Sequence, residues 1–143
     1  MLPIRLRYVA DLMRRIIYTS RSLIDGSLAA LDAIVAESIA WNTEVGVTGM
    51  LWWDGRNFAQ VIEGEHDGVA VTIDRIRGDR RHRDMDVLFD RVVLTRQFGD
   101  WAMRRADDGV ESTPGTTFLL GFALGEPTPS AKRLYDIIIA TES

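Results

Sequence analysis

The middle of the chain constrains the fold most, because it predicts a β-hairpin. Apolar runs at 46–53 and 57–63 flank the dipeptide Asp54-Gly55, a strong signal for a two-residue turn between antiparallel strands. The other elements predicted in the first hundred residues are a strand at 14–20, a helix that begins after Ser27, a second helix at 67–77 and strands near 86–95 and 101–106. Their order, β-α-β-β-α-β-β, predicts an α+β fold: a ferredoxin-like split β-α-β sheet with an additional fifth strand and two helices on one face.

The first predicted helix has a clear start and one recurring face. Ser27 is a plausible N-cap. The residues that recur after it at spacings of three and four positions are Leu28, Leu31, Val35, Ser38 and Asn42, which is the spacing of one helix face. Asn42 therefore extends an apolar stripe with an amide.

The composition of the chain changes along its length. Residues 1–13 show no clear periodicity and are interpreted as an N-terminal extension, and residues 14–107 form the predicted sheet-and-helix domain. The stretch 107–116 is rich in Asp, Gly, Ser, Thr and Pro, as in a linker. An apolar segment at 117–124 and a predicted helix at 130–141 follow. Residues 108–143 are therefore expected to form a linker and a helical cap.

Composition excludes several functions. The chain has no cysteine and only two histidines, so disulfides, thiolate chemistry and a metal site are not expected. A net charge of −4 gives no bias toward nucleic acid, and no apolar run is long enough for a membrane span. The sequence predicts a cytoplasmic protein without a metal.

Three polar side chains interrupt apolar faces. Gln60 shares a strand face with Phe58 and Ile62, because side chains alternate along a strand, and Tyr18 lies on the apolar face of the first strand. With Asn42 they should converge under the helices, since the first and third strands are expected to be parallel neighbours. Burying an amide without a partner costs about 1–3 kcal/mol. One explanation is that these groups bond one another in an ordinary core; the other is that they meet the polar edge of a planar heterocycle.

The chain resembles the BLUF family, blue-light sensors that use a flavin. The motifs that carry the resemblance lie between Arg14 and Asp107 and occur in order: IIYTSRS, WNTEVGVTGML, DGRNFAQVIEG, GDRRHRDM and FGDWAM. No single motif is specific, but the ordered set is.

The resemblance implies a flavin held between the two helices. FAD is the expected form, and FMN and riboflavin are the alternatives. Tyr18 would be the light-driven electron and proton donor, and Gln60 the amide whose hydrogen bonds rearrange, by rotation or by tautomerisation. Trp101 and Met103 would relay the signal along the last strand. The resemblance implies that the cofactor-binding residues are Tyr18, Ile34, Asn42, Phe58, Gln60, Arg75, Ile76, Asp79, Arg81 and His82. The basic turn at 80–83 could meet a phosphate or simply face water.

The sequence departs from the usual family pattern at Trp41, where a polar or basic residue is more common, and at Trp52-Trp53. No effector domain is recognisable, so the resemblance implies a sensor that is not an enzyme and that acts through self-association or an effector protein. The alternatives are a flavin-free ferredoxin-like module that binds a small ligand or catalyses a reaction, and an RNA-binding sheet. The acidic chain lacks the exposed aromatic motif and the basic face that RNA recognition needs.

Overall fold

The computed structural model describes residues 12–98, 102–103, 132 and 136. Its elements are β1 (Met13–Ser22), α2 (Leu28–Val45), β2 (Val47–Trp53), β3 (Asn57–Glu65), α3 (His66–Arg77) and β4 (His82–Val93). The α+β class and the order of these elements agree with the sequence prediction. No helix in the described part of the chain is long and apolar enough to span a membrane.

The four strands form one sheet in the order β2-β3-β1-β4, and every neighbouring pair is antiparallel. The first and third strands are neighbours as predicted, but the expectation that they run parallel is wrong. The tight hairpin after β2 reverses the chain, whereas the α2 crossover makes β1 and β2 parallel to each other. Since β3 lies between those two strands, it is antiparallel to both.

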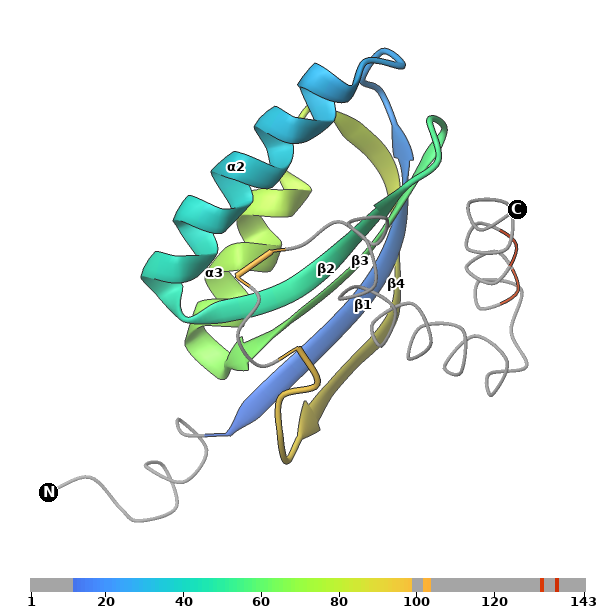
Figure 1. The fold of residues 1–143 in the computed structure, drawn as a ribbon. Helices are drawn as coiled ribbons and strands as arrows, with labels where there is room; N and C mark the ends of the chain where they lie inside the picture. Colours follow the sequence, from blue (N-terminus) through green and yellow to red (C-terminus); the bar gives the residue numbers. More distant parts are fainter. Residues whose placement is uncertain (1–11, 99–101, 104–131, 133–135, 137–143) are drawn as a thin grey trace, which may run out of the picture.

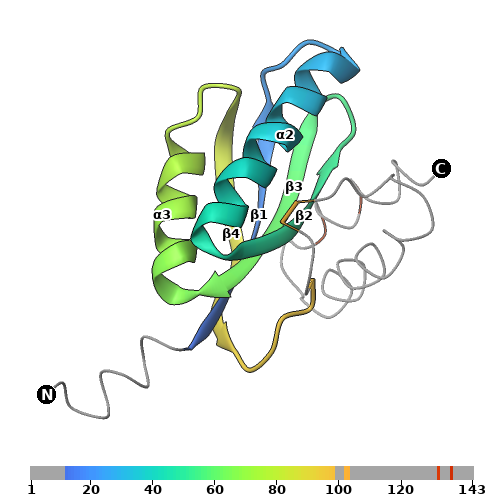
Figure 2. The same ribbon diagram turned by 60° about the vertical axis from the view of Figure 1, so that its left-hand side comes forward.

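Both helices lie side by side on one face of the sheet (Figures 1 and 2). The core between the two layers includes Ile16, Leu31, Val47, Phe58, Ile62, Val69 and Ile73. α2 begins where its cap predicts, because the Ser27 hydroxyl accepts from the Ala30 amide at 3.2 Å. Leu28, which was expected on the buried stripe, is instead exposed, since it occupies the first position of the helix.

The hairpin turn lies one residue later than predicted. The Asp54 amide donates to the Asn57 carbonyl at 3.3 Å, so Gly55 and Arg56, rather than Asp54 and Gly55, are the central residues. Gly55 has φ +94°, which suits a glycine at the first central position. The Asp54 carboxylate accepts from the amides of Arg56 and Asn57 at 2.8 and 2.7 Å and fixes this register.

The last strand begins earlier than predicted. β4 starts at His82, which pairs with Ser22 of β1, because pairing along β1 outweighs the low strand propensity of this polar turn. Ala102 and Met103 form a bend, so the fifth strand predicted at 101–106 is not seen in the described residues. The N-terminal extension up to residue 11 and the C-terminal cap, apart from Lys132 and Asp136, lie outside them.

Candidate functional site

A cleft between α2, α3 and the sheet collects most of the predicted site residues. It holds about 490 Å³ of empty space, part of it open to solvent. Its lining consists of Tyr18, Ile34, Ser38, Leu51, Phe58, Gln60, Arg75, Ile76, Asp79, Arg81 and His82. Every residue of the predicted binding set except Asn42 is present. Part of the lining is apolar surface from Ile34, Leu51, Phe58 and Ile76, and the other lining residues carry hydroxyl, amide, imidazole or charged groups. The cleft therefore suits a small organic ligand with both apolar and polar parts.

Two lining residues were missed by sequence reasoning, and each had a signal. Ser38 lies on the same helix stripe as Leu31 and Asn42. Leu51 is the register partner of Gln60 across the β2–β3 pair, and directly opposed residues share a face. A turn centred on Asp54-Gly55 would have paired Leu51 with Phe58, which shares the face of Gln60, so the hairpin predicted the face of Leu51 although not its partner.

Tyr18 and Gln60 form a buried hydrogen-bonded pair in the wall of the cleft. They are direct register partners on β1 and β3, with 3% and 5% of their surface exposed. The Tyr18 hydroxyl donates to Gln60 Oε1. Burial raises the Tyr18 pKa far above its usual value, and the negative charge of Asp79 raises it further. The phenol is therefore neutral, and its proton points at the amide oxygen.

Gln60 and Asn42, the two amides of the predicted set, donate hydrogen bonds to Met103 and Ala102, which follow β4 in the chain. Gln60 Nε2 lies 3.7 Å from Met103 Sδ as a donor, and Asn42 Nδ2 donates to the Ala102 carbonyl at 2.7 Å. Asn42 is buried but does not line the cleft, so the predicted contact of Asn42 with a flavin stays a prediction. Met103 belongs to the core beside Tyr18, whereas Trp101, its predicted relay partner, lies outside the described residues.

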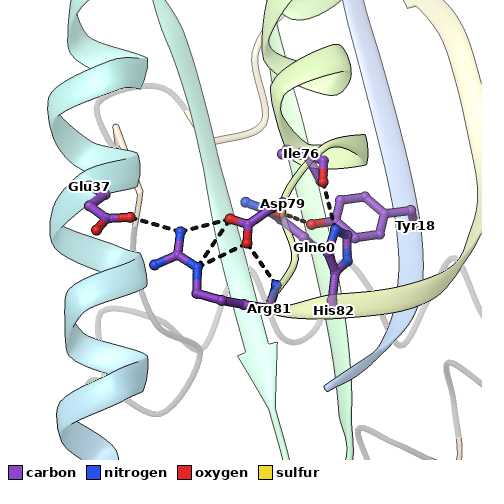
Figure 3. A network of polar contacts seen from close by, with 7 residues as sticks. All are labelled: Tyr18, Glu37, Gln60, Ile76, Asp79, Arg81 and His82. Atoms are coloured by element: carbon purple, nitrogen blue, oxygen red, sulfur yellow. Dashed lines mark hydrogen bonds and ion pairs between the residues drawn. The ribbon is translucent and has the colours of Figure 1, made fainter. Parts of the chain in front are cut away.

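Charged side chains of the cleft lining form a network of ion pairs that reaches α2 (Figure 3). Arg81 binds Asp79 through its Nε and Nη2 and binds Glu37 of α2 through Nη2, with both Nη2 contacts at 2.7 Å. The side-chain hydrogen bond from Arg81 holds the Asp79 pKa below its usual value, and the same bond raises the pKa of Arg81. Sequence reasoning missed Glu37, because no local pattern indicates a pair that spans 44 positions.

His82 is fixed at both ring nitrogens. Its Nε2 lies 2.6 Å from the Ile76 carbonyl, and its Nδ1 lies 2.8 Å from the Ser20 hydroxyl. A carbonyl oxygen can only accept, so Nε2 carries the hydrogen. The predicted basic cluster is thus divided: Arg81 and His82 are held by protein partners, and Arg80 and Arg83 are exposed and do not line the cleft.

None of the three tryptophans that depart from the family pattern lines the cleft. Trp41 of α2 donates from Nε1 to Thr72 Oγ1 of α3 at 3.0 Å. Trp53 packs against the core and donates to the Ser22 hydroxyl at 3.1 Å. Trp52 points to the other face of the sheet and is 1% exposed. Among the described residues, no group of three metal-ligating side chains comes together.

Comparisons with known proteins agree with this geometry. A family model described as "BLUF: Sensors of blue-light using FAD" matches residues 13–104. Over 111 residues the chain is 29% identical to the photoactivated adenylate cyclase subunit beta of Euglena gracilis, a match that covers 76% of this chain and 13% of that protein. The chain therefore spans a small fraction of the curated relatives it matches.

Two solved structures are similar over different shares of their length. The dark-state structure of BlrB, a BLUF protein, has a TM-score of 0.68 and 25% identity, and the match covers 94% of this chain and 99% of that one. Klebsiella pneumoniae BlrP1, solved with FMN and cyclic diGMP, has a TM-score of 0.60 and 32% identity. That match covers 65% of this chain and 25% of BlrP1.

Proposed function

The chain belongs to the BLUF family of blue-light sensors that use FAD, and from this premise we propose that Tyr18 and Gln60 are its photoactive pair. The protein is a blue-light photoreceptor with a flavin cofactor. The observation that carries the assignment of the pair is the buried hydrogen bond from the Tyr18 hydroxyl to Gln60 Oε1 in the wall of the cleft.

The residues of the cleft fit a flavin. Ile34, Leu51, Phe58 and Ile76 offer apolar surface on both the helix and the sheet sides, which suits a flat ring system. The Gln60 amide offers a donor and an acceptor to a heterocycle edge with both functions. The charged lining residues Arg75, Asp79 and Arg81 suit a polar chain that leaves the ring. We propose the lining residues of the predicted set as the flavin-binding residues.

When bound, a flavin supplies blue-light absorption and, in its excited state, a strong oxidant. Tyr18 is suited to lose an electron together with its proton, because the proton already has an acceptor in Gln60 Oε1. The neutral phenol is preserved in the dark by its raised pKa. When Tyr18 loses or regains its proton, the Gln60 amide must change which hydrogen bonds it donates and which it accepts.

Gln60 links this event to the segment after β4. Its oxygen faces Tyr18 and its nitrogen faces Met103, so rotation or tautomerisation of the amide alters both contacts together. We propose that Met103 responds to the state of Gln60, and that Trp101 takes part in the relay. The signal then passes to another copy of the chain or to an effector protein.

We propose that this chain senses light and is not itself an enzyme, and that it acts in the cytoplasm. In the Euglena cyclase and in BlrP1 the matched region is a small part of a longer protein. The flavin-free alternative loses its support, because the family uses FAD.

Absorption spectroscopy tests the proposed function. Purified protein, loaded with flavin if necessary, should be yellow, and blue light should shift its visible band to slightly longer wavelength with recovery in darkness. Protein that cannot be loaded with any flavin, or that shows no reversible shift, would contradict the proposal.

A further inference from the structure

The segment that follows β4 is fastened to the face of the sheet away from the helices. Glu63 of β3 lies on that face, because side chains alternate along a strand and Ile62 belongs to the core under the helices. The Glu63 carboxylate is fully buried and accepts from Arg15 of β1 and from the Phe98 amide. Arg15 also donates to the Thr95 carbonyl at 3.3 Å. Because a buried charge is retained only with such partners, it ties residues 95 and 98 to two neighbouring strands.

Arg96 fastens the same segment to β2 and to the end of α2. Its Nη1 donates to Thr48 Oγ1 at 2.9 Å and to the Glu63 carbonyl at 3.3 Å, and its Nη2 donates to the Gly46 carbonyl at 2.8 Å. Gly46 is the C-cap of α2, whose last turn has no basic residue of its own. The carbonyls at a helix C-terminus lack partners within the helix and attract a positive charge. Arg96 therefore supplies that charge from 50 positions away in the chain.

A few residues later the chain contacts the helix side of the sheet. The Ala102 carbonyl accepts from Asn42 at 2.7 Å, and Met103 Sδ lies 3.7 Å from Gln60 Nε2. Only residues 99–101 separate these contacts from Phe98. Four residues of chain reach at most about 14 Å, so a fixed Phe98 limits how far Met103 can move away from Gln60.

We propose that Glu63 and Arg96 are positioning residues of the relay from Gln60. They fix the start of the segment after β4, so that Met103 is held against Gln60 in the dark and moves to one defined place in the light. The inference rests on the proposed photoreceptor and adds the anchor of its relay. Neither residue lines the cleft, so flavin binding and the Tyr18–Gln60 pair should not depend on them.

The test follows the Met103 methyl group by NMR in flavin-loaded protein labelled at its methionine methyl groups. The Met103 signal is identified from its loss in Met103→Leu. In the wild-type protein this signal should have one position in the dark and a second position under blue light, because the Gln60 amide changes its hydrogen bonds. The distance between the two positions, called here the light displacement, is the quantity compared among variants.

The anchor variants are Glu63→Gln and Arg96→Leu. Each should keep the reversible shift of flavin absorption, because the photoactive pair is unchanged, and should lose at least half of the light displacement. The dark signal should also move toward that of a solvent-exposed methionine, since Met103 is held less firmly. If Glu63→Gln does not fold, Arg96→Leu decides the test, because Arg96 is only half-buried. Loss of the reversible absorption shift in Arg96→Leu would overturn the inference, because the residue would then support the photoactive pair itself.

Two controls separate anchoring from a general loss of stability. Gln97 is the next residue in the segment and is exposed, so Gln97→Leu should keep the wild-type light displacement. Val61 is fully buried two positions before Glu63 on the same strand face, and Val61→Ala removes packing but no hydrogen bond to the segment. Urea denaturation gives the free energy of unfolding of each variant. A loss of light displacement in Val61→Ala equal to that of Arg96→Leu would mean that general loosening, not the anchor, explains the result.

The outcomes separate this inference from the proposed function. A full light displacement in the folded anchor variants would overturn the inference and leave the photoreceptor standing. Wild-type protein that shows the absorption shift but no light displacement would overturn the relay through Met103 together with its anchor. Absence of the absorption shift from the wild-type protein would instead contradict the proposed function itself.

Discussion

Tyr18 and Gln60 face each other on neighbouring antiparallel strands, and the phenol of one donates to the amide oxygen of the other. The same amide reaches Met103 through its nitrogen. One side chain therefore connects a buried proton donor with the segment that follows β4.

Tyr18→Phe should keep the flavin and lose the light response. The change removes only the hydroxyl, so packing against β3 and the cleft wall persists, but the proton donated to Gln60 is gone. Absorption spectra of the loaded variant should show bound flavin and no reversible shift to longer wavelength. A full reversible shift in this variant would show that Tyr18 is not the donor.

Gln60→Leu should also abolish the reversible shift. Leucine fills similar space but can neither accept from Tyr18 nor donate toward Met103. Gln97 provides the control, since it is exposed and outside the cleft, and Gln97→Leu should respond to light as the wild-type protein does. If Gln60→Leu still formed the red-shifted state, the switch would lie elsewhere.

We expect Glu63, on the face of β3 away from the helices, to make a large contribution to the free energy of unfolding. It is fully buried, pairs with Arg15 at 2.9 Å and accepts from the Phe98 amide at 2.5 Å. Glu63→Gln keeps the shape but removes the charge, and should lower the free energy of unfolding by about 2 kcal/mol. Urea denaturation measures this change.

The matched control for Glu63 is a second pair between a carboxylate and an arginine. Asp90 binds Arg14 at 2.7 Å and is 40% exposed, so Asp90→Asn should cost less than about 1 kcal/mol. Equal losses in the two variants would mean that burial of Glu63 adds nothing to its pairing.

Asp79 should contribute stability that disappears in acid. Its pKa in the folded protein is lowered, first by the hydrogen bond from Arg81, so the unfolded state takes up the proton more readily. The contribution is present above the ordinary carboxyl pKa and is lost as the pH falls through the lowered one. Thermal melting of Asp79→Asn should show a deficit relative to wild type at pH 6 that shrinks at pH 3.

Asp84→Asn is the comparison for that experiment, because the Asp84 side chain is 68% exposed and its contact with Arg83 is long, at 3.7 Å. This variant should melt close to the wild-type protein at both pH values. A deficit of Asp79→Asn that does not change with pH would show that the Arg81 contact does not depend on the charge of Asp79.

Local patterns predicted a large part of the fold and of the cleft. The Ser27 cap set the start of α2, and strand alternation placed Tyr18 and Gln60 on the helix-covered face. These features depend on residues a few positions apart, so the sequence encodes them directly. The direction of β1 against β3 was predicted wrongly, since it depends on how the hairpin and the α2 crossover combine.

What the sequence by itself determined is therefore the order of the elements and the residue types that face the cleft. Only the tertiary structure decided which polar groups pair: Asn42 with the Ala102 carbonyl, Arg81 with Glu37, and Arg75 with the ring of Trp41. Each of these contacts joins elements that are distant or separate in the chain. Their formation depends on how closely α2 and α3 pack on the sheet, which the whole core sets rather than any local pattern.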